Sequence, residues 1–141
     1  MAKVLASIFT DLTTALTTVI GSEFIYLGNR PKLGDKSEPM KKFAVIQLPV
    51  SIEDIAVGKK KFALSTTGVF YLFTQSKKDS TLNLTASSDL ADDVSGLFPI
   101  DGKFCQATNP SVLMKGEDGF GYQVTTITFD LRTKAKVFDN S

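Results

Sequence analysis

The run Asn109–Leu131, NPSVLMKGEDGFGYQVTTITFDL, constrains the fold most, because two apolar stretches flank a short acidic turn. The turn, Gly116–Gly119, consists of two glycines around two acids, and the flanking arms are rich in Val, Ile, Thr, Tyr and Phe. β-branched and aromatic residues favour strands, whereas glycine and acidic residues favour tight turns. The run therefore predicts a β-hairpin near the end of the chain.

The second arm of this hairpin changes its apolar side along its length. Its early apolar residues have even numbers and its later ones have odd numbers: Phe120, Tyr122 and Val124, then Ile127, Phe129 and Leu131. A strand has a period of two, so the apolar face changes sides around Thr125–Thr126. Two explanations fit this pattern. Either a β-bulge lies there, or the strand is covered on different faces at its two ends, with the far half meeting another subunit.

Two segments have the periodicity of amphipathic helices. In residues 4–20 apolar side chains recur at steps of three and four, and Gly21 suits the end of a helix. Threonines occupy most of the other side of this helix, where a membrane-surface helix would carry Lys or Arg, so core packing is favoured. The second helix lies within residues 82–98, is closed by Pro99, and has apolar residues spaced by four: Leu82, Ala86, Leu90, Val94 and Phe98.

The remaining segments predict strands and loops. Residues 23–27, 43–50 and 62–75 have strand patterns, residues 102–107 and 111–114 are strand pieces, and residues 51–61 form a turn or a short irregular strand. Residues 28–41 are polar with mixed charge, so we expect a loop that is mobile in the free protein and ordered in an assembly. This order predicts an α+β fold, with a mostly antiparallel sheet of four to five strands packed on two helices. We expect one domain over residues 1–132 and a flexible tail over residues 133–141.

The composition excludes several kinds of chemistry. The 141 residues include no histidine and one cysteine, Cys105, so Ser-His-Asp and Cys-His devices and an internal disulfide are absent. Zinc loses its commonest nitrogen ligand, and no glycine-rich nucleotide-binding motif is present. We therefore predict neither an enzyme nor a bound metal or cofactor, and we expect Cys105 to be a packed apolar side chain. No stretch reaches the roughly 18–20 apolar residues of a membrane span, which favours a soluble protein of a reducing compartment.

The charged residues resemble ordinary surface groups more than sites. The net charge of +1 argues against a dedicated nucleic-acid binder. Three pairs of adjacent acids occur in polar surroundings and are interpreted as solvated: Glu53–Asp54, Asp92–Asp93 and Glu117–Asp118. The basic run Lys59, Lys60 and Lys61 could contact phosphate, although an exposed sheet edge explains it better.

The hairpin run resembles the C-terminal hairpin of tail-terminator proteins from long-tailed bacteriophages. In that family a Pro-Ser-Val-like strand, a Gly-acid-Gly turn and a Tyr-Gln-Val strand follow one another, as in residues 110–124 here. Upstream, SDLADDVSGLFPIDG (residues 88–102) resembles the helix that precedes this hairpin in the family. The first helix and FAVIQLPV (residues 43–50) also fall in the family's order. The resemblance is specific over about Asp89–Leu131.

The resemblance implies a structural role. Tail terminators form hexameric rings on the last ring of the tail tube, stop its growth and offer a docking surface to the head–tail connector or stopper protein. The chain is thus expected to be a ring-forming subunit at the head-proximal end of the virion tail, assembled in the host cytoplasm. DNA would cross the lumen without specific binding, and no membrane would be involved. The alternatives are a tail-tube or head-completion ring protein and, from another class, a small-molecule binding domain.

Candidate contact residues follow from charge and from the change of apolar face. For the partner interface we predict residues from two basic segments, the acidic turn and the last strand: Arg30, Lys32, Lys36, Lys59, Lys60, Lys61, Glu117, Asp118, Ile127 and Phe129. The acids of the second helix, Asp89, Asp92 and Asp93, lie off its apolar stripe and face either the lumen or a solvated outer surface. An acidic lumen would repel DNA phosphates and keep them from sticking.

Overall fold

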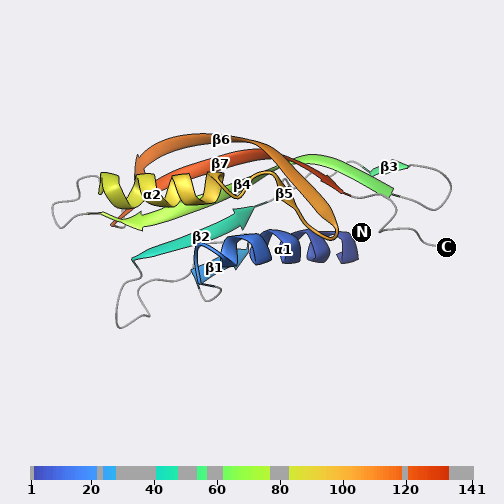
Figure 1. The fold of residues 1–141 in the computed structure, drawn as a ribbon, viewed down its shortest axis with the longest axis horizontal. Helices are drawn as coiled ribbons and strands as arrows, with labels where there is room; N and C mark the ends of the chain where they lie inside the picture. The colour runs from blue at the N-terminus through green and yellow to red at the C-terminus, as the bar shows by residue number, and fades with distance from the viewer. Residues whose placement is uncertain are drawn as a thin grey trace.

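The computed structural model describes residues 2–21, 24–27, 41–47, 54–56, 62–76, 83–118 and 121–133, with the backbone alone at 2–6, 54–56, 62–65 and 133. Two helices and seven strands lie in these ranges (Figure 1). Their order is α1 (Ala2–Thr17), β1 (Ile25–Leu27), β2 (Lys42–Gln47), β3 (Asp54–Ala56), β4 (Phe62–Gln75), α2 (Leu84–Ser95), β5 (Ile100–Asp101), β6 (Cys105–Glu117) and β7 (Tyr122–Thr133).

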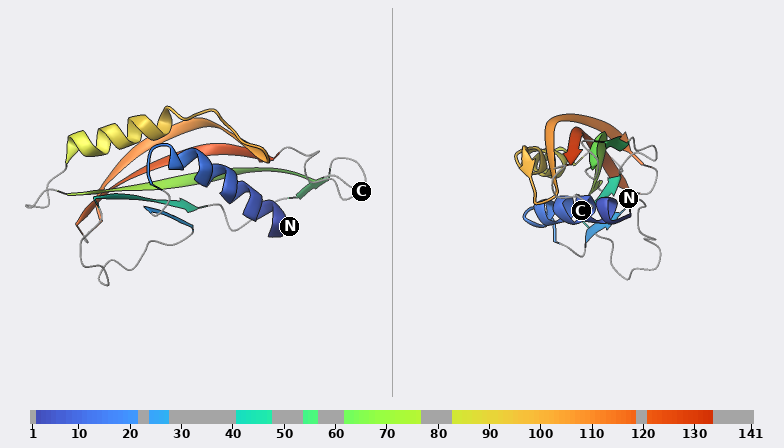
Figure 2. Two further views of the ribbon diagram at one scale, coloured as in Figure 1. Left: turned by 60° about the horizontal axis from the view of Figure 1, so that its bottom comes forward. Right: turned by 90° about the vertical axis from the view of Figure 1, so that its right-hand side faces the viewer.

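Six strands form one curled sheet in the order β1-β2-β4-β7-β6-β5, and β3 pairs separately with the start of β4. The strands β1 and β2 are parallel, and the other described pairs are antiparallel. Figure 2 shows that β4, β6 and β7 run along the length of the molecule. The predicted α+β class with a mostly antiparallel sheet is confirmed. The predicted count of four to five strands is too low, because the three-residue β3 and the two-residue β5 leave little periodicity to read.

Both helices bury their apolar stripes against the same face of the sheet. The main core combines side chains of α1 and α2 with those of β2, β4, β6 and β7, among them Ile8, Leu12, Leu16, Leu90, Val94, Ile46, Phe70, Ile127 and Phe129. The polar side of α1 is satisfied locally, since Thr14 Oγ1 donates a 2.8 Å hydrogen bond to the Thr10 carbonyl. Neither helix in the described ranges is long and apolar enough to cross a membrane.

A half-buried carboxylate joins α1 to the turn between β5 and β6. Asp11 Oδ2 accepts hydrogen bonds from the backbone N–H groups of Phe104, at 2.6 Å, and Cys105, at 3.0 Å. Gly102 lies directly beside this carboxyl group, so that a Cβ added there would lie 2.8 Å from the Asp11 Cβ. The charged acceptor fixes the first helix to a turn more than ninety residues away. Cys105 itself is fully buried, as the sequence predicted.

A second, smaller cluster lies on the opposite face of the sheet. Its buried members are Phe43, Val45, Phe73 and Tyr122. The Phe43 and Phe73 rings stack with centroids 4.4 Å apart, and the Tyr122 ring meets Phe43 edge-on at 5.1 Å. This cluster explains why Phe43–Ile46 in β2 is apolar on both alternating faces, because the strand contributes to both cores.

The change of apolar face along β7 has its cause within the chain. The register of β4 with β7 is unbroken from Ser65–Arg132 to Gln75–Tyr122, so the predicted bulge near Thr125–Thr126 is wrong for this strand. The early half of β7 supplies Tyr122 to the second cluster, and the later half supplies the main core. The prediction that the two halves of β7 are covered on different faces is confirmed. The far half of the strand is covered by the chain's own helices, so another subunit is not needed to explain the pattern.

The bulges occur in β6 instead. The register of β6 with β7 shifts between Thr108 and Ser111 and again between Met114 and Gly116. The first shift contains Asn109 with a φ of 58°, a left-handed conformation that asparagine tolerates better than most residues, and the second contains Gly116 with a φ of 101°. The two predicted strand pieces are therefore one bulged strand. It continues through the predicted turn as far as Glu117.

Candidate interaction surface on the β6 edge

The central part of β6 exposes large apolar side chains on both of its faces. Val112 is 45% exposed, Leu113 is 58% exposed and Met114 is 43% exposed. Consecutive residues of a strand point to opposite faces, so neither face of this stretch is covered by a helix or a second sheet layer. On its outer side β5 pairs only with Gln106 and Ala107, and no other described strand pairs with that edge. This stretch, Ser111–Met114, is called the open edge below.

The open edge is a regular stretch of β6 between its two bulges. Pro110 stands before it and has no N–H to donate to a ladder, and Lys115 stands after it. Natural sheets protect their free edges with proline, lysine and bulges. Here those devices flank four residues and leave the four themselves unprotected. Exposed apolar surface on an unprotected edge is typical of a contact site.

The tip of the hairpin is held by its own acids. The Asp118 N–H donates to the Tyr122 carbonyl at 2.8 Å. Glu117 Oε1 accepts from the Gly121 N–H at 2.9 Å, and Asp118 Oδ1 accepts from the Tyr122 N–H at 3.1 Å. Both predicted interface acids therefore shape the turn, although Glu117 is also exposed. A partner could reach Glu117 without disturbing the fold.

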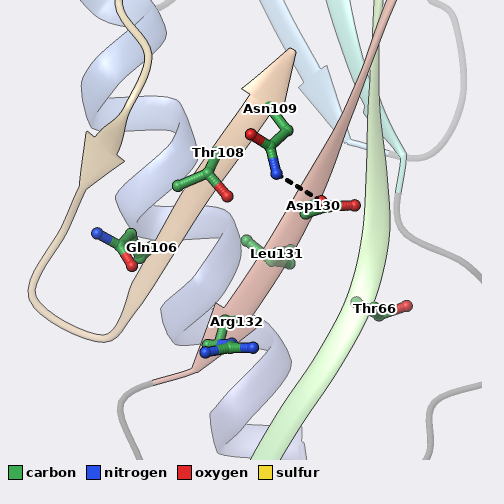
Figure 3. Close-up of a pocket in the computed structure, with 7 residues that line it drawn as sticks. All are labelled: Thr66, Gln106, Thr108, Asn109, Asp130, Leu131 and Arg132. Atoms are coloured by element: carbon green, nitrogen blue, oxygen red, sulfur yellow. Dashed lines mark hydrogen bonds between the residues drawn. The ribbon is translucent and has the colours of Figure 1, made fainter. Parts of the chain in front are cut away.

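A polar pocket of about 430 Å³ lies at the first bulge (Figure 3). It is lined from β4, β6 and β7 by Thr66, Gln106, Thr108, Asn109, Asp130, Leu131 and Arg132. Figure 3 shows the one hydrogen bond drawn among them, in which Asn109 Nδ2 donates to Asp130 Oδ2 at 2.9 Å. This bond holds the left-handed Asn109 in place. The pocket offers hydrogen-bonding groups and one charge of each sign, which suits a polar surface of a partner more than an apolar ligand.

Two of the predicted interface residues are wrong. Ile127 is 0% exposed and Phe129 is 1% exposed, and both belong to the main core beneath the helices. A partner could reach them only if the fold opened. Sequence reasoning took their change of face as a sign of a contact with another subunit, whereas the exposed apolar residues lie on the neighbouring strand. The only sequence signal of these exposed residues was the apolar run Val112–Met114, which lies between a proline and a lysine.

Other predicted site residues are exposed or lie outside the described ranges. Asp89, Asp92 and Asp93 are exposed on α2, away from its buried side. The six basic candidates fall outside the described residues: Arg30, Lys32, Lys36, Lys59, Lys60 and Lys61. So do residues 28–40 of the predicted mobile loop and residues 134–141 of the predicted tail, whereas Thr133, the first residue of that tail, is the last residue of β7. Across the described ranges, no group of three or more His, Cys, Asp or Glu side chains is placed to hold a metal ion.

Comparison with known proteins shows the fold alone. No family model and no curated protein sequence matches this chain. Among solved structures, one protein whose name states no function superposes with a TM-score of 0.58, over 95% of this chain and 96% of its own. The two sequences are 10% identical. The chain is similar to that protein in the arrangement of its helices and strands over nearly the whole length of both.

Proposed function

We propose that this chain is a structural subunit of a bacteriophage tail, and specifically the tail terminator that caps the tube at its head-proximal end. The open edge of β6 is the observation that carries the proposal, because it presents apolar side chains and an unpaired strand side to a partner. The resemblance over Asp89–Leu131 supports the same role. The subunits form a hexameric ring that ends tube growth and receives the connector or stopper protein.

The exposed acids of α2 have a place in this proposal. Asp89, Asp92 and Asp93 form a surface without a basic residue on the same helix. Turned toward the lumen, they repel the phosphates of passing DNA, so that the genome crosses without binding. The repulsion acts over about 10 Å at 0.1 M salt, which limits it to DNA close to the wall.

The alternative of a small-molecule binding domain is less well supported. That alternative placed a pocket between the helices and the sheet, but this space is filled by the main core, whose members are mostly fully buried. The pockets described here lie instead at the two bulges of β6, and the second, of about 220 Å³, is lined by Met114, Lys115, Gly116, Gln123, Val124 and Thr125. Both belong to the hairpin that the assembly proposal uses.

Labelling of virions tests the proposal. An antibody raised against the recombinant chain is expected to mark the head-proximal end of long tails in electron micrographs, in a ring of six copies. Label along the whole tube would make the chain a tube subunit, and label on tail-less capsids would make it a head-completion protein. Virions that carry no label at all would refute a role in the tail.

A further inference from the structure

Among the described strands, β1 and β6 end the same rows of residues at opposite sides of the sheet. Leu27 on β1 pairs with Ile46, Ile46 pairs with Phe70, Phe70 pairs with Ile127, and Ile127 pairs with Val112 on β6. One straight row of partners thus crosses five strands, from one edge of the sheet to the other. Members of a row point to the same face, so the exposed Leu27 and the exposed Val112 both lie on the face that carries the helices.

The next two rows behave in the same way. The row through Val45, Tyr71 and Thr126 joins Tyr26 to Leu113, and the row through Ala44, Leu72 and Thr125 joins Ile25 to Met114. The whole of β1 therefore lies level with three residues of the open edge. All six terminal residues of these rows are apolar or aromatic, and the three on β6 are exposed.

Opposite charges stand on the row two positions beyond the one through Ala44. Lys42 pairs with Thr74, Thr74 pairs with Gln123, and Gln123 pairs with Glu117. Lys42 and Glu117 are both exposed and lie on the same face of the sheet. Lys42, near one side of the sheet, and Glu117, at the other side, therefore lie on the same row and carry opposite charges.

We propose that β1 of a second copy of this chain pairs with the open edge of β6, and so continues the sheet from one copy into the next. The register sets Leu27 of the second copy against Val112 and brings its Lys42 toward Glu117. The strand directions agree with this pairing. Three antiparallel pairings separate β2 from β6, so β2 and its parallel neighbour β1 run opposite to β6. When two copies stand side by side in one orientation, β1 of one copy is therefore antiparallel to β6 of the other. The inference rests on the proposed function, since it names the contact through which the ring subunits join.

This contact has the geometry of a ring joint. Each copy gives one edge to one neighbour and the other edge to the next, which is a heterologous contact that closes by rotation. The joint is short, because Pro110 and the bulge after Met114 confine regular pairing to the open edge. A single joint of this length is weak, so association is expected to rise steeply with protein concentration as joints close the ring.

A disulfide between the two edges tests the register directly. Leu27→Cys combined with Val112→Cys places one thiol at each end of a single row. Within one chain four strand spacings of about 4.8 Å separate the two positions, far more than a disulfide spans. Oxidation at high protein concentration is therefore expected to give a ladder of covalently joined copies that ends in a closed species. The buried Cys105 stays in place in every variant, and the wild type serves as its control.

The matched control moves one thiol by a single residue. Leu27→Cys combined with Leu113→Cys uses a position that is more exposed than Val112, but its thiol lies on the other face and one row away. We expect at least a tenfold smaller yield of joined copies from this pair than from the matched pair. Equal yields, or no ladder from the matched pair, would overturn the proposed joint.

Charge exchange provides a second test that introduces no new thiol. Lys42→Glu and Glu117→Lys each place like charges on the two sides of the joint, two strand spacings apart, and each is expected to weaken self-association about twofold in sedimentation experiments at low salt. An equimolar mixture of the two variants restores opposite charges at every joint between unlike copies and is expected to associate more strongly than either variant alone. A mixture that associates no better than its components would contradict the proposed register.

These experiments separate the joint from the function. A ladder from the matched pair, together with virions that carry no label, would retain the joint and reject the tail. Labelled tail ends without any ladder from the matched pair would retain the tail and reject this joint.

Discussion

The carboxylate of Asp11 is expected to contribute a large share of the stability of this fold. Asp11→Ala removes the acceptor of two backbone N–H groups, those of Phe104 and Cys105. A hydrogen bond to a charged group contributes about 1.5–3 kcal/mol, and the half-exposed position of Asp11 favours the lower end for each bond. We therefore expect a loss of about 3 kcal/mol in the free energy of unfolding. Native domains are stable by only about 5–15 kcal/mol, so the effect is large.

Thermal and urea unfolding, followed by circular dichroism, measure this loss. For a domain of this size 3 kcal/mol corresponds to a drop in Tm of roughly 10 °C. Asp11→Asn keeps an oxygen acceptor without the charge and is expected to lose about half as much. Asp92→Ala, the same kind of change at an exposed carboxylate, is the matched control and should melt within about 2 °C of the wild type. If Asp11→Ala melts with this control, the contact between α1 and the β5–β6 turn does not hold the fold together.

Three further changes test the packing. Leu90→Ala truncates a side chain that is 3% exposed in the main core and should lower the free energy of unfolding by about 2–5 kcal/mol in chemical unfolding. An unchanged midpoint would place α2 outside the core. Thr74→Val and Ser87→Ala each break the buried 2.7 Å hydrogen bond between β4 and α2, and each should cost about 1–3 kcal/mol; a double variant as unstable as the sum of both would show that the two hydroxyls are not coupled. Gly102→Ala pushes a methyl group into the Asp11 carboxyl and should lower the Tm of the wild type by several degrees. In an Asp11→Ala background the same change should lower Tm much less. Equal losses of Tm in both backgrounds would show that the contact is absent.

Local patterns in the sequence predict the elements well. The strand Phe62–Gln75 is found with the predicted bounds, α2 lies within its predicted segment, and α1 begins two residues before its predicted segment and ends three residues before the end of that segment. These features depend on periodicity and on breakers such as Gly21 and Pro99, which act within a few residues. The local pattern therefore contains the physical cause of each element.

Partners across the sheet could not be predicted in the same way. That β1 is parallel to β2, and that β7 lies between β4 and β6, depends on pairings between distant parts of the chain. The same limit explains the error at Ile127 and Phe129. An apolar residue in a strand has the same pattern whether the chain itself or a partner covers it, and only the position of α2 and α1 decides between the two.

The order of the strands in the sheet has a consequence for how the chain folds. Among the described strands β7 comes last in the sequence, yet it lies in the middle of the sheet, paired along most of its length with β4 and with β6. During synthesis, β4 and β6 are therefore made before β7, and they can join one sheet only when β7 pairs with both. We expect the closure of β7 against β4 to be the slow step, because it joins residues about 47–67 positions apart and such non-local pairings form slowly. Until that step, the facing edges of β4 and β6 are as open as the outer edge of β6 in the finished fold, so a nascent chain exposes two more sites for strand addition than the native subunit does.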